Sequence, residues 1–171
     1  KAKEIAGGNG MVAVNIMAVT QLYETYVKTA CAAGVDAIIS GAGLPTELPK
    51  FAEGYNVALA PIVSSTKSAN VILKFWDKKY HRTADFLVIE GPLAGGHLGF
   101  SKEQLEDIPS LDYDTEIQNI IALKQTYEEK YQTTIPVFVA GGMFTAKDAA
   151  CHGAWCRWHP GSHPVCCHGR M

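Results

Sequence analysis

Residues 88–100 read VIEGPLAGGHLGF and join an apolar run to a glycine-rich loop. The run over 85–90 is nearly continuous in apolar residues, as expected for a strand buried on both faces of a parallel sheet. Glycines then stand at positions 91, 95, 96 and 99, with His97 among them. Glycine lets the backbone adopt positive φ and approach a flat or anionic ligand closely. The stretch therefore predicts a buried strand that ends in a ligand-binding loop.

The same alternation of short apolar runs and helical patterns extends in both directions. The predicted strands cover residues 11–17, 36–40, 57–63, 85–90 and 135–140. The predicted helices cover residues 20–33, 46–53, 67–79 and 114–131. Strands that alternate with helices indicate an α/β fold built from right-handed crossover units around a parallel sheet.

Small or polar residues follow nearly every predicted strand, including Ser64-Ser65 and Gly141-Gly142. Functional groups at the carboxyl end of every strand are typical of a (β/α)₈ TIM barrel, whereas an open sheet concentrates them at one switch point. Neither a G-x-G-x-x-G motif after the first strand nor a P-loop lysine is present. A whole barrel needs roughly 250 residues. The five strands are therefore predicted to form part of a TIM barrel.

Length, charge and cysteine usage narrow the class of protein. The 171 residues suit one domain, and a net charge of −2 offers no electrostatic footprint for nucleic acid or an anionic membrane. No apolar run approaches the roughly 20 residues of a membrane span. Cys31 is the one cysteine before position 151, which is typical of a cytoplasmic protein with a buried thiol. The chain starts without an initiator Met, and we expect it to begin inside a helix of a longer protein.

Two groups at the predicted strand ends could carry chemistry. His97 could act as a base near neutral pH, although a solvated histidine in a flexible turn is the plainer interpretation. The glycines Gly141 and Gly142, placed before a helix, offer free backbone amides to a phosphate. A simple strand-to-helix turn would account for them equally well.

Two more polar residues invite a functional interpretation. Asn15 lies in a predicted buried strand, where its amide must find a partner in the protein or in a ligand. A core asparagine bonded to a neighbouring strand is the alternative. Lys67 follows Ser64-Ser65-Thr66 and would by itself be a solvated lysine at a helix start.

Four segments together resemble the nitronate monooxygenase (2-nitropropane dioxygenase) family over residues 1–150. They are Asn15-Ile-Met, Ser40-Gly-Ala-Gly-Leu-Pro45, Glu90-Gly-Pro-Leu-Ala-Gly-Gly-His97 and Val139-Ala-Gly-Gly142, of which Ala-Gly-Gly-His is the most specific. The resemblance implies an FMN-binding barrel of which the third to seventh strands are present. It implies a catalytic His97 and no metal. The FMN-binding residues it implies are Asn15, Lys67, Gly95, Gly96, Gly141 and Gly142.

The activity that the resemblance implies is oxidation of an alkyl nitronate with O2, with His97 as base for a neutral nitroalkane. An NAD(P)H-dependent FMN reductase of the enoyl-acyl carrier protein reductase or quinone reductase type fits the same motifs. A phosphate-binding barrel without flavin is a more distant alternative. A non-functional fragment is another, because unpaired strand edges predict poor solubility and weak or absent FMN binding for the 171-residue chain.

Residues 151–171 differ sharply from the preceding 1–150 barrel domain. They hold four Cys, four His and two Trp, yet no Leu, Ile, Asp, Glu or Lys. The spacing fits no paired C-x-x-C zinc site. Residues 152–170 can be back-translated and reread one base later as MELGADGIQVATRFVATEE, which resembles the eighth strand of the family. We therefore hypothesise an out-of-frame tail, which the encoding DNA would test.

Overall fold

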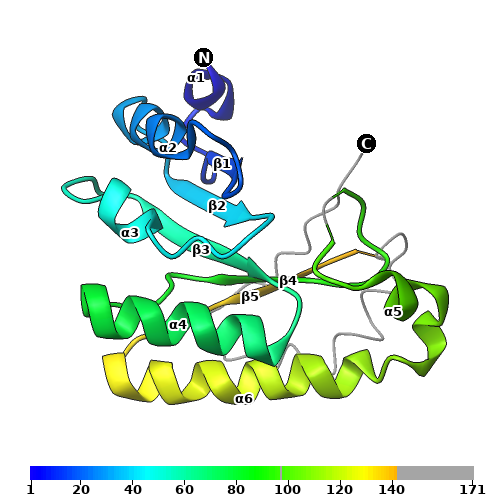
Figure 1. Ribbon diagram of the computed structural model, residues 1–171. Helices are drawn as coiled ribbons and strands as arrows, with labels where there is room; N and C mark the ends of the chain where they lie inside the picture. Colours follow the sequence, from blue (N-terminus) through cyan, green and yellow to red (C-terminus); the bar gives the residue numbers. More distant parts are fainter. Residues whose placement is uncertain (97, 142–171) are drawn as a thin grey trace.

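The computed structural model describes residues 1–96 and 98–141 of the chain. Its centre is a five-stranded sheet in the order β1-β2-β3-β4-β5, with each neighbouring pair parallel (Figure 1). The strands are β1 (Ala13–Met17), β2 (Ala37–Gly41), β3 (Ala58–Val63), β4 (Leu87–Glu90) and β5 (Val137–Ala140). All five predicted strands are confirmed. His97, Gly142 and the predicted tail 151–171 lie outside the described residues.

Helices connect consecutive strands, as the sequence predicted. They are α1 (Ala2–Ala6), α2 (Tyr23–Ala32), α3 (Leu48–Phe51), α4 (Thr66–Tyr80), α5 (Lys102–Glu106), the 3₁₀ helix η1 (Ile108–Ser110) and α6 (Tyr113–Tyr131). The two longest, α4 and α6, lie side by side beneath the sheet in Figure 1. None of the helices in the described part of the chain is long and apolar enough to cross a membrane.

The short helices α5 and η1 were not predicted. Their segment holds no apolar run with a helical period, so hydrophobic patterning does not reveal it. Its first helix is set by local hydrogen bonds instead, since Ser101 accepts from the Gln104 amide and the Gln104 side chain accepts from the Ser101 amide. These two helices form a lid segment between β4 and α6.

One face of the sheet forms the hydrophobic core with the helices. Its strands contribute side chains of which at most 6% is exposed, including Ile16, Ile38, Leu59, Leu87 and Ile89. Helix α4 adds Trp76, which is fully buried and donates its indole N–H to the Pro45 carbonyl oxygen at 3.1 Å. Burying each such large apolar side chain contributes about 2 kcal/mol. This one-sided core holds the five strands together.

The opposite face of the sheet is only partly covered in the described structure. Strand alternation and register place on it Ala13, Asn15, Met17, Ile39, Ala58, Ile62, Val88, Glu90, Phe138 and Ala140, which are exposed or half-buried, and the buried small residues Ala37, Gly41 and Ala60. In a closed barrel this face would line the interior. The sheet is open, and the prediction of a partial barrel is confirmed.

Carboxylates hold the amino ends of the strands. Asp36 accepts from the Val12 amide at 2.8 Å, and Asp85 accepts from the Leu59 amide at 2.7 Å. Each carboxylate also pairs with a cation, Lys3 at 2.7 Å and Arg82 at 2.6 Å respectively. The Val12 and Leu59 amides thereby have acceptors that they would otherwise lack. This rim of the sheet therefore contributes to stability.

Candidate functional site

The loops that follow β4 and β5 meet at the carboxyl rim of the sheet. The Gly91 amide donates to the Ala140 carbonyl oxygen at 2.8 Å. Gly141 has a φ of +98°, and a Cβ on it would lie 2.6 Å from the backbone nitrogen of Ala94. Only glycine fits this position, because any side chain would be both strained and blocked. The β4 loop and the β5 turn are therefore in direct contact.

Gly95 and Gly96, which precede His97, have no close neighbour among the described residues. No described atom lies within 4 Å of the position that a Cβ would take on either glycine, and Gly96 has a φ of +94°. Both residues are exposed. They thus leave their backbone accessible on the same rim as Gly141. His97 and Gly142 lie beyond what the structure describes, but the residues that flank them share one rim.

Lys67 follows β3 at the same rim and is exposed as the second residue of α4. The amino end of this helix is already occupied by groups of the protein. Ser65 caps it in a reciprocal box with Ser68, and the Glu116 carboxylate accepts from the Thr66 amide at 2.6 Å. The exposed ammonium of Lys67 is thus one group of this turn that a ligand could reach.

Asn15 departs from the prediction that its strand is buried. Its side chain is exposed, because β1 is an edge strand and its inward face is uncovered. Asn15 is paired in register with Ile39 of β2. It faces inward two residues before Met17, which ends β1. The residue also borders an apolar hollow of about 470 Å³ between β1 and α2. Asn15 shares a face with the rim residues without a described contact to them.

Glu90 is a site residue that the sequence analysis quoted but did not select. Among the inward-facing positions of the five strands, Asn15 and Glu90 carry the polar side chains. The Glu90 side chain is half-buried, and burial raises its pKa above the usual range. Tyr113 fixes the backbone there by donating its hydroxyl to the Glu90 carbonyl oxygen at 2.5 Å. A carboxylate that ends the apolar strand Leu87–Glu90 was the signal that could have revealed it.

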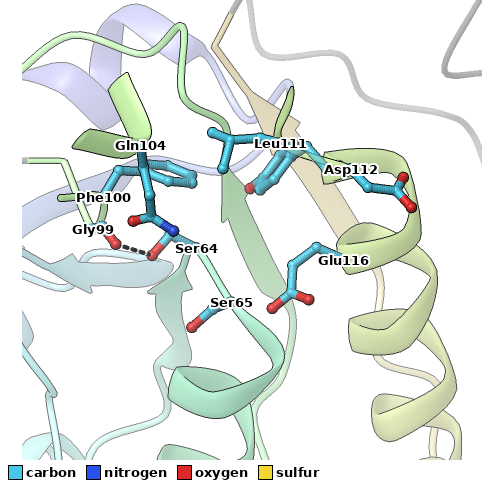
Figure 2. A pocket seen from close by; sticks show the side chains of 9 residues that line it. Ser64, Ser65, Gly99, Phe100, Gln104, Leu111, Asp112 and Glu116 are labelled. Carbon is cyan, nitrogen blue, oxygen red and sulfur yellow. Dashed lines mark hydrogen bonds between the residues drawn. The ribbon is translucent and has the colours of Figure 1, made fainter. Parts of the chain in front are cut away.

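A cavity of about 250 Å³ opens beside these loops (Figure 2). It lies between the carboxyl end of β3, the lid segment and the first turn of α6. Figure 2 shows the side chains of Ser64, Gln104 and Glu116 gathered around it. Sequence reasoning did not anticipate this cavity, because the segment that contributes Gln104 of the unpredicted α5 and Leu111 to its lining was not predicted to be structured.

Parallel strands in chain order, with helices on one face and glycine-rich turns at the carboxyl rim, are the features of part of a (β/α)₈ barrel. Within that class, the nitronate monooxygenase family model matches residues 1–155. The chain belongs to the nitronate monooxygenase family, whose members are FMN-dependent oxidoreductases.

Two solved structures show the same fold. FabK from Thermotoga maritima aligns with a TM-score of 0.61 and 21% identity over 90% of this chain and 41% of that chain. Its M276A mutant aligns with a TM-score of 0.60 and 21% identity over 90% of this chain and 43% of that chain. The chain thus spans less than half the length of these structures. No curated protein matches it significantly.

Proposed function

We propose that the whole protein is an FMN-dependent oxidoreductase that oxidises alkyl nitronates with O2. Family membership supports the class of reaction. The observation that carries the proposal is the contact between the glycine loop after β4 and the Gly141 turn after β5, which brings Gly141 beside Ala94, the residue before Gly95 and Gly96. FabK-like proteins share the barrel, so the fold alone does not separate oxidation of nitronates from reduction of other substrates.

The residues at the rim fit FMN. A phosphate would be bound by the backbone amide of Gly141, just beyond β5, together with that of Gly142, which the sequence pattern adds. The backbone at Gly95 and Gly96 would allow close approach of a flat ring, because no atom of the described residues lies within 4 Å of either Cβ position. The Lys67 ammonium and the Asn15 amide would add a charge and a hydrogen-bonding group. When bound, FMN supplies the redox chemistry, while the protein positions the substrate and manages protons.

His97 would take the α-proton of a neutral nitroalkane as a general base. A nitronate has already lost that proton, so it does not need the base. Replacing His97 with Gln should therefore lower kcat/KM for the nitroalkane by roughly 10²- to 10⁴-fold and leave the nitronate within a few-fold. Equal losses with both substrates would show that His97 does not act as the base.

An NAD(P)H-dependent flavin reductase is the second candidate. Its support is the fold shared with FabK and the motif Ala94-Gly95-Gly96-His97, which suits both activities. Mixing the FMN-loaded whole protein with NADH without oxygen separates the two. Rapid bleaching of the flavin absorbance supports the reductase, and an unchanged spectrum supports the monooxygenase.

Three further expectations accompany this proposal. We infer a cytoplasmic location from the single cysteine in the first 150 residues. The division into a barrel domain over 1–150 and an out-of-frame tail over 151–171 stays a hypothesis, since the tail lies outside the described residues. A non-functional fragment stays the alternative for the isolated 171-residue chain.

A further inference from the structure

The chain between β4 and α6 leaves the carboxyl rim of the sheet and returns to it. It runs from Gly91 through the glycine-rich loop and the lid segment, and then enters α6 at Tyr113. The Tyr113 side chain reaches back to the residue where β4 ends, because its hydroxyl donates to the Glu90 carbonyl oxygen at 2.5 Å. One side chain therefore joins two points of the backbone that are 23 positions apart.

The ring of Tyr113 also contacts both ends of the glycine-rich loop. At the start of the loop, a Cβ on Gly91 would lie 3.4 Å from Cε1 of the ring, so the ring lies against the backbone there. At the end of the loop, Phe100 forms an edge-to-face pair with the ring, with centroids 5.6 Å apart. Such a pair stabilises beyond the burial of its area. The loop from Gly91 to Phe100 thus has its two ends held together by one aromatic side chain.

A further contact attaches the end of the loop to the sheet. Ser64, directly after β3, donates its hydroxyl to the Gly99 carbonyl oxygen at 3.3 Å (Figure 2). Between the two ends, Gly95 and Gly96 have no described atom within 4 Å of their Cβ positions. The backbone that is proposed to meet FMN is therefore positioned by contacts at the ends of its loop.

Holding the ends of a glycine-rich loop has a consequence for binding. Fixing glycine costs more conformational entropy than fixing any other residue. A loop that is ordered before the ligand arrives spares the binding step this cost. The apparent affinity of the ligand falls with the fraction of protein molecules whose loop is ordered. Contacts that order this loop should therefore tighten the binding of its ligand.

The Tyr113 hydroxyl is suited to a permanent contact. Burial, and after it the neighbouring carboxylates of Glu90 and Glu116, raises the pKa of Tyr113 above its usual value. The hydroxyl therefore keeps its proton throughout the neutral range and remains a hydrogen-bond donor.

We propose that Tyr113 is a positioning residue for FMN, which holds the ends of the glycine-rich loop together and so keeps Gly95 and Gly96 in place for the cofactor. Tyr113 acts through the loop and does not need to touch FMN. The inference rests on the proposed function, because it takes FMN to bind at this loop. It assigns a role to the first residue of α6, which the glycine pattern of the sequence does not reveal.

The test removes the hydroxyl alone in Tyr113→Phe and the whole aromatic ring in Tyr113→Leu. In the whole protein, the Kd for FMN should rise about 3- to 10-fold in Tyr113→Phe, as expected for the loss of one hydrogen bond. It should rise by about 30-fold or more in Tyr113→Leu, because the ring pair with Phe100 is lost as well. Quenching of flavin fluorescence measures both values.

Tyr131→Phe is the matched control. Tyr131 ends the same helix and donates its hydroxyl to the Asp77 carboxylate at 2.6 Å. Its loss removes a comparable hydrogen bond at the opposite end of α6, so stability should fall while the Kd for FMN stays the same. In the FMN-free protein, the backbone NMR order parameters of Gly95 and Gly96 should fall in Tyr113→Phe and remain unchanged in Tyr131→Phe.

The outcomes separate this inference from the proposed function. An unaltered Kd for FMN in Tyr113→Phe and Tyr113→Leu would overturn the inference, and so would an equal rise in Tyr131→Phe. A whole protein that binds no FMN would overturn the inference together with the proposed function. Binding of FMN that depends on Tyr113, in a protein that does not oxidise nitronates, would refute the proposed activity and retain the inference. If Tyr113→Leu does not fold, Tyr113→Phe decides alone, because it keeps the ring.

Discussion

The amino rim and the carboxyl rim of the sheet use polar residues in opposite ways. At the amino rim, Asp36 and Asp85 each accept a backbone amide from the neighbouring strand and pair with a cation. At the carboxyl rim, Gly95 and Gly96 present open backbone, and Glu90 is half-buried on the uncovered face.

This difference separates stability from function within one sheet. Polar groups that are satisfied internally have nothing left for a ligand, whereas exposed backbone and an inward carboxyl remain available. The amino rim therefore holds the strands together, and the carboxyl rim is where a cofactor can bind. Substitutions at the two rims should have separable effects.

The largest effect is expected at the carboxyl rim, from Gly141→Val. The new side chain would be strained at a φ of +98° and would meet Ala94. We expect FMN affinity to fall by about 100-fold or more, since the loop must move, with a loss of roughly 1–3 kcal/mol in stability. Quenching of flavin fluorescence and urea unfolding measure the two quantities.

Gly54→Val is the matched control for that substitution. Gly54 has a φ of +83°, but no atom of the described residues lies within 4 Å of its Cβ position. The strain is similar and the site is untouched, so stability should fall while FMN affinity stays the same. Comparable losses of affinity in the two variants would mean that strain, and not the rim, governs binding.

The next largest effect is expected at the amino rim, from Asp85→Ala. This substitution leaves the amide of fully buried Leu59 without its acceptor. The free energy of unfolding should drop by about 1–3 kcal/mol, as for other buried donors left unpaired. FMN affinity should not change. Asp85→Asn retains an acceptor oxygen and should recover part of the lost stability. A drop in FMN affinity in Asp85→Ala would show that the two rims do not act separately.

A smaller, pH-dependent effect is expected from Glu90→Gln. Burial raises the folded-state pKa of Glu90, so the ionised carboxylate costs stability and the wild type loses stability as pH rises through that pKa. The Gln variant should therefore be more stable than the wild type at pH 7, and the two should be equally stable below about pH 4. A pKa shift of one unit corresponds to roughly 1.4 kcal/mol of stability. The stability gained by the Gln variant should be only a fraction of that value, because water screens the exposed half of the Glu90 carboxyl. Thermal unfolding across this range would contradict the account if the gain grew toward low pH.

The smallest effect is expected from Asp36→Asn. Lys3 and the Val12 amide lower the pKa of Asp36, so its stabilisation is present above the unfolded-state pKa and is lost as pH falls through the folded-state value. The variant should be slightly less stable than the wild type at pH 7, and the difference should shrink toward pH 2. Asp114→Asn, an exposed neutralisation elsewhere, serves as the control in the same unfolding series.

The sequence predicted the strands better than the lid segment. Apolar runs such as 57–63 and 135–140 marked their strands within about two residues, because short runs rich in apolar and β-branched residues favour strands. The helices α5 and η1 carry no such pattern and depend on capping hydrogen bonds. The cavity that Gln104 of α5 helps to line was therefore beyond sequence reasoning.

The candidate site was predictable in part. Glycines after β4 and β5 indicated where backbone is exposed, and the structure adds that Gly141 is blocked by Ala94. The environment of Asn15 was predicted wrongly, since its apolar run alone indicates a buried strand, whereas β1 is an edge strand with an uncovered face. Glu90 was overlooked because whether a carboxylate at a strand end points inward depends on register.

The most direct test of the central claim maps where FMN binds. FMN is titrated into the isotopically labelled whole protein, and backbone amide shifts are followed at both rims. The account predicts saturable one-to-one binding, with shifts at Gly95, Gly96 and Gly141 and little change at Val12 and Leu59. Shifts centred on the amino rim, or saturable binding that leaves Gly95 and Gly141 unmoved, would contradict it.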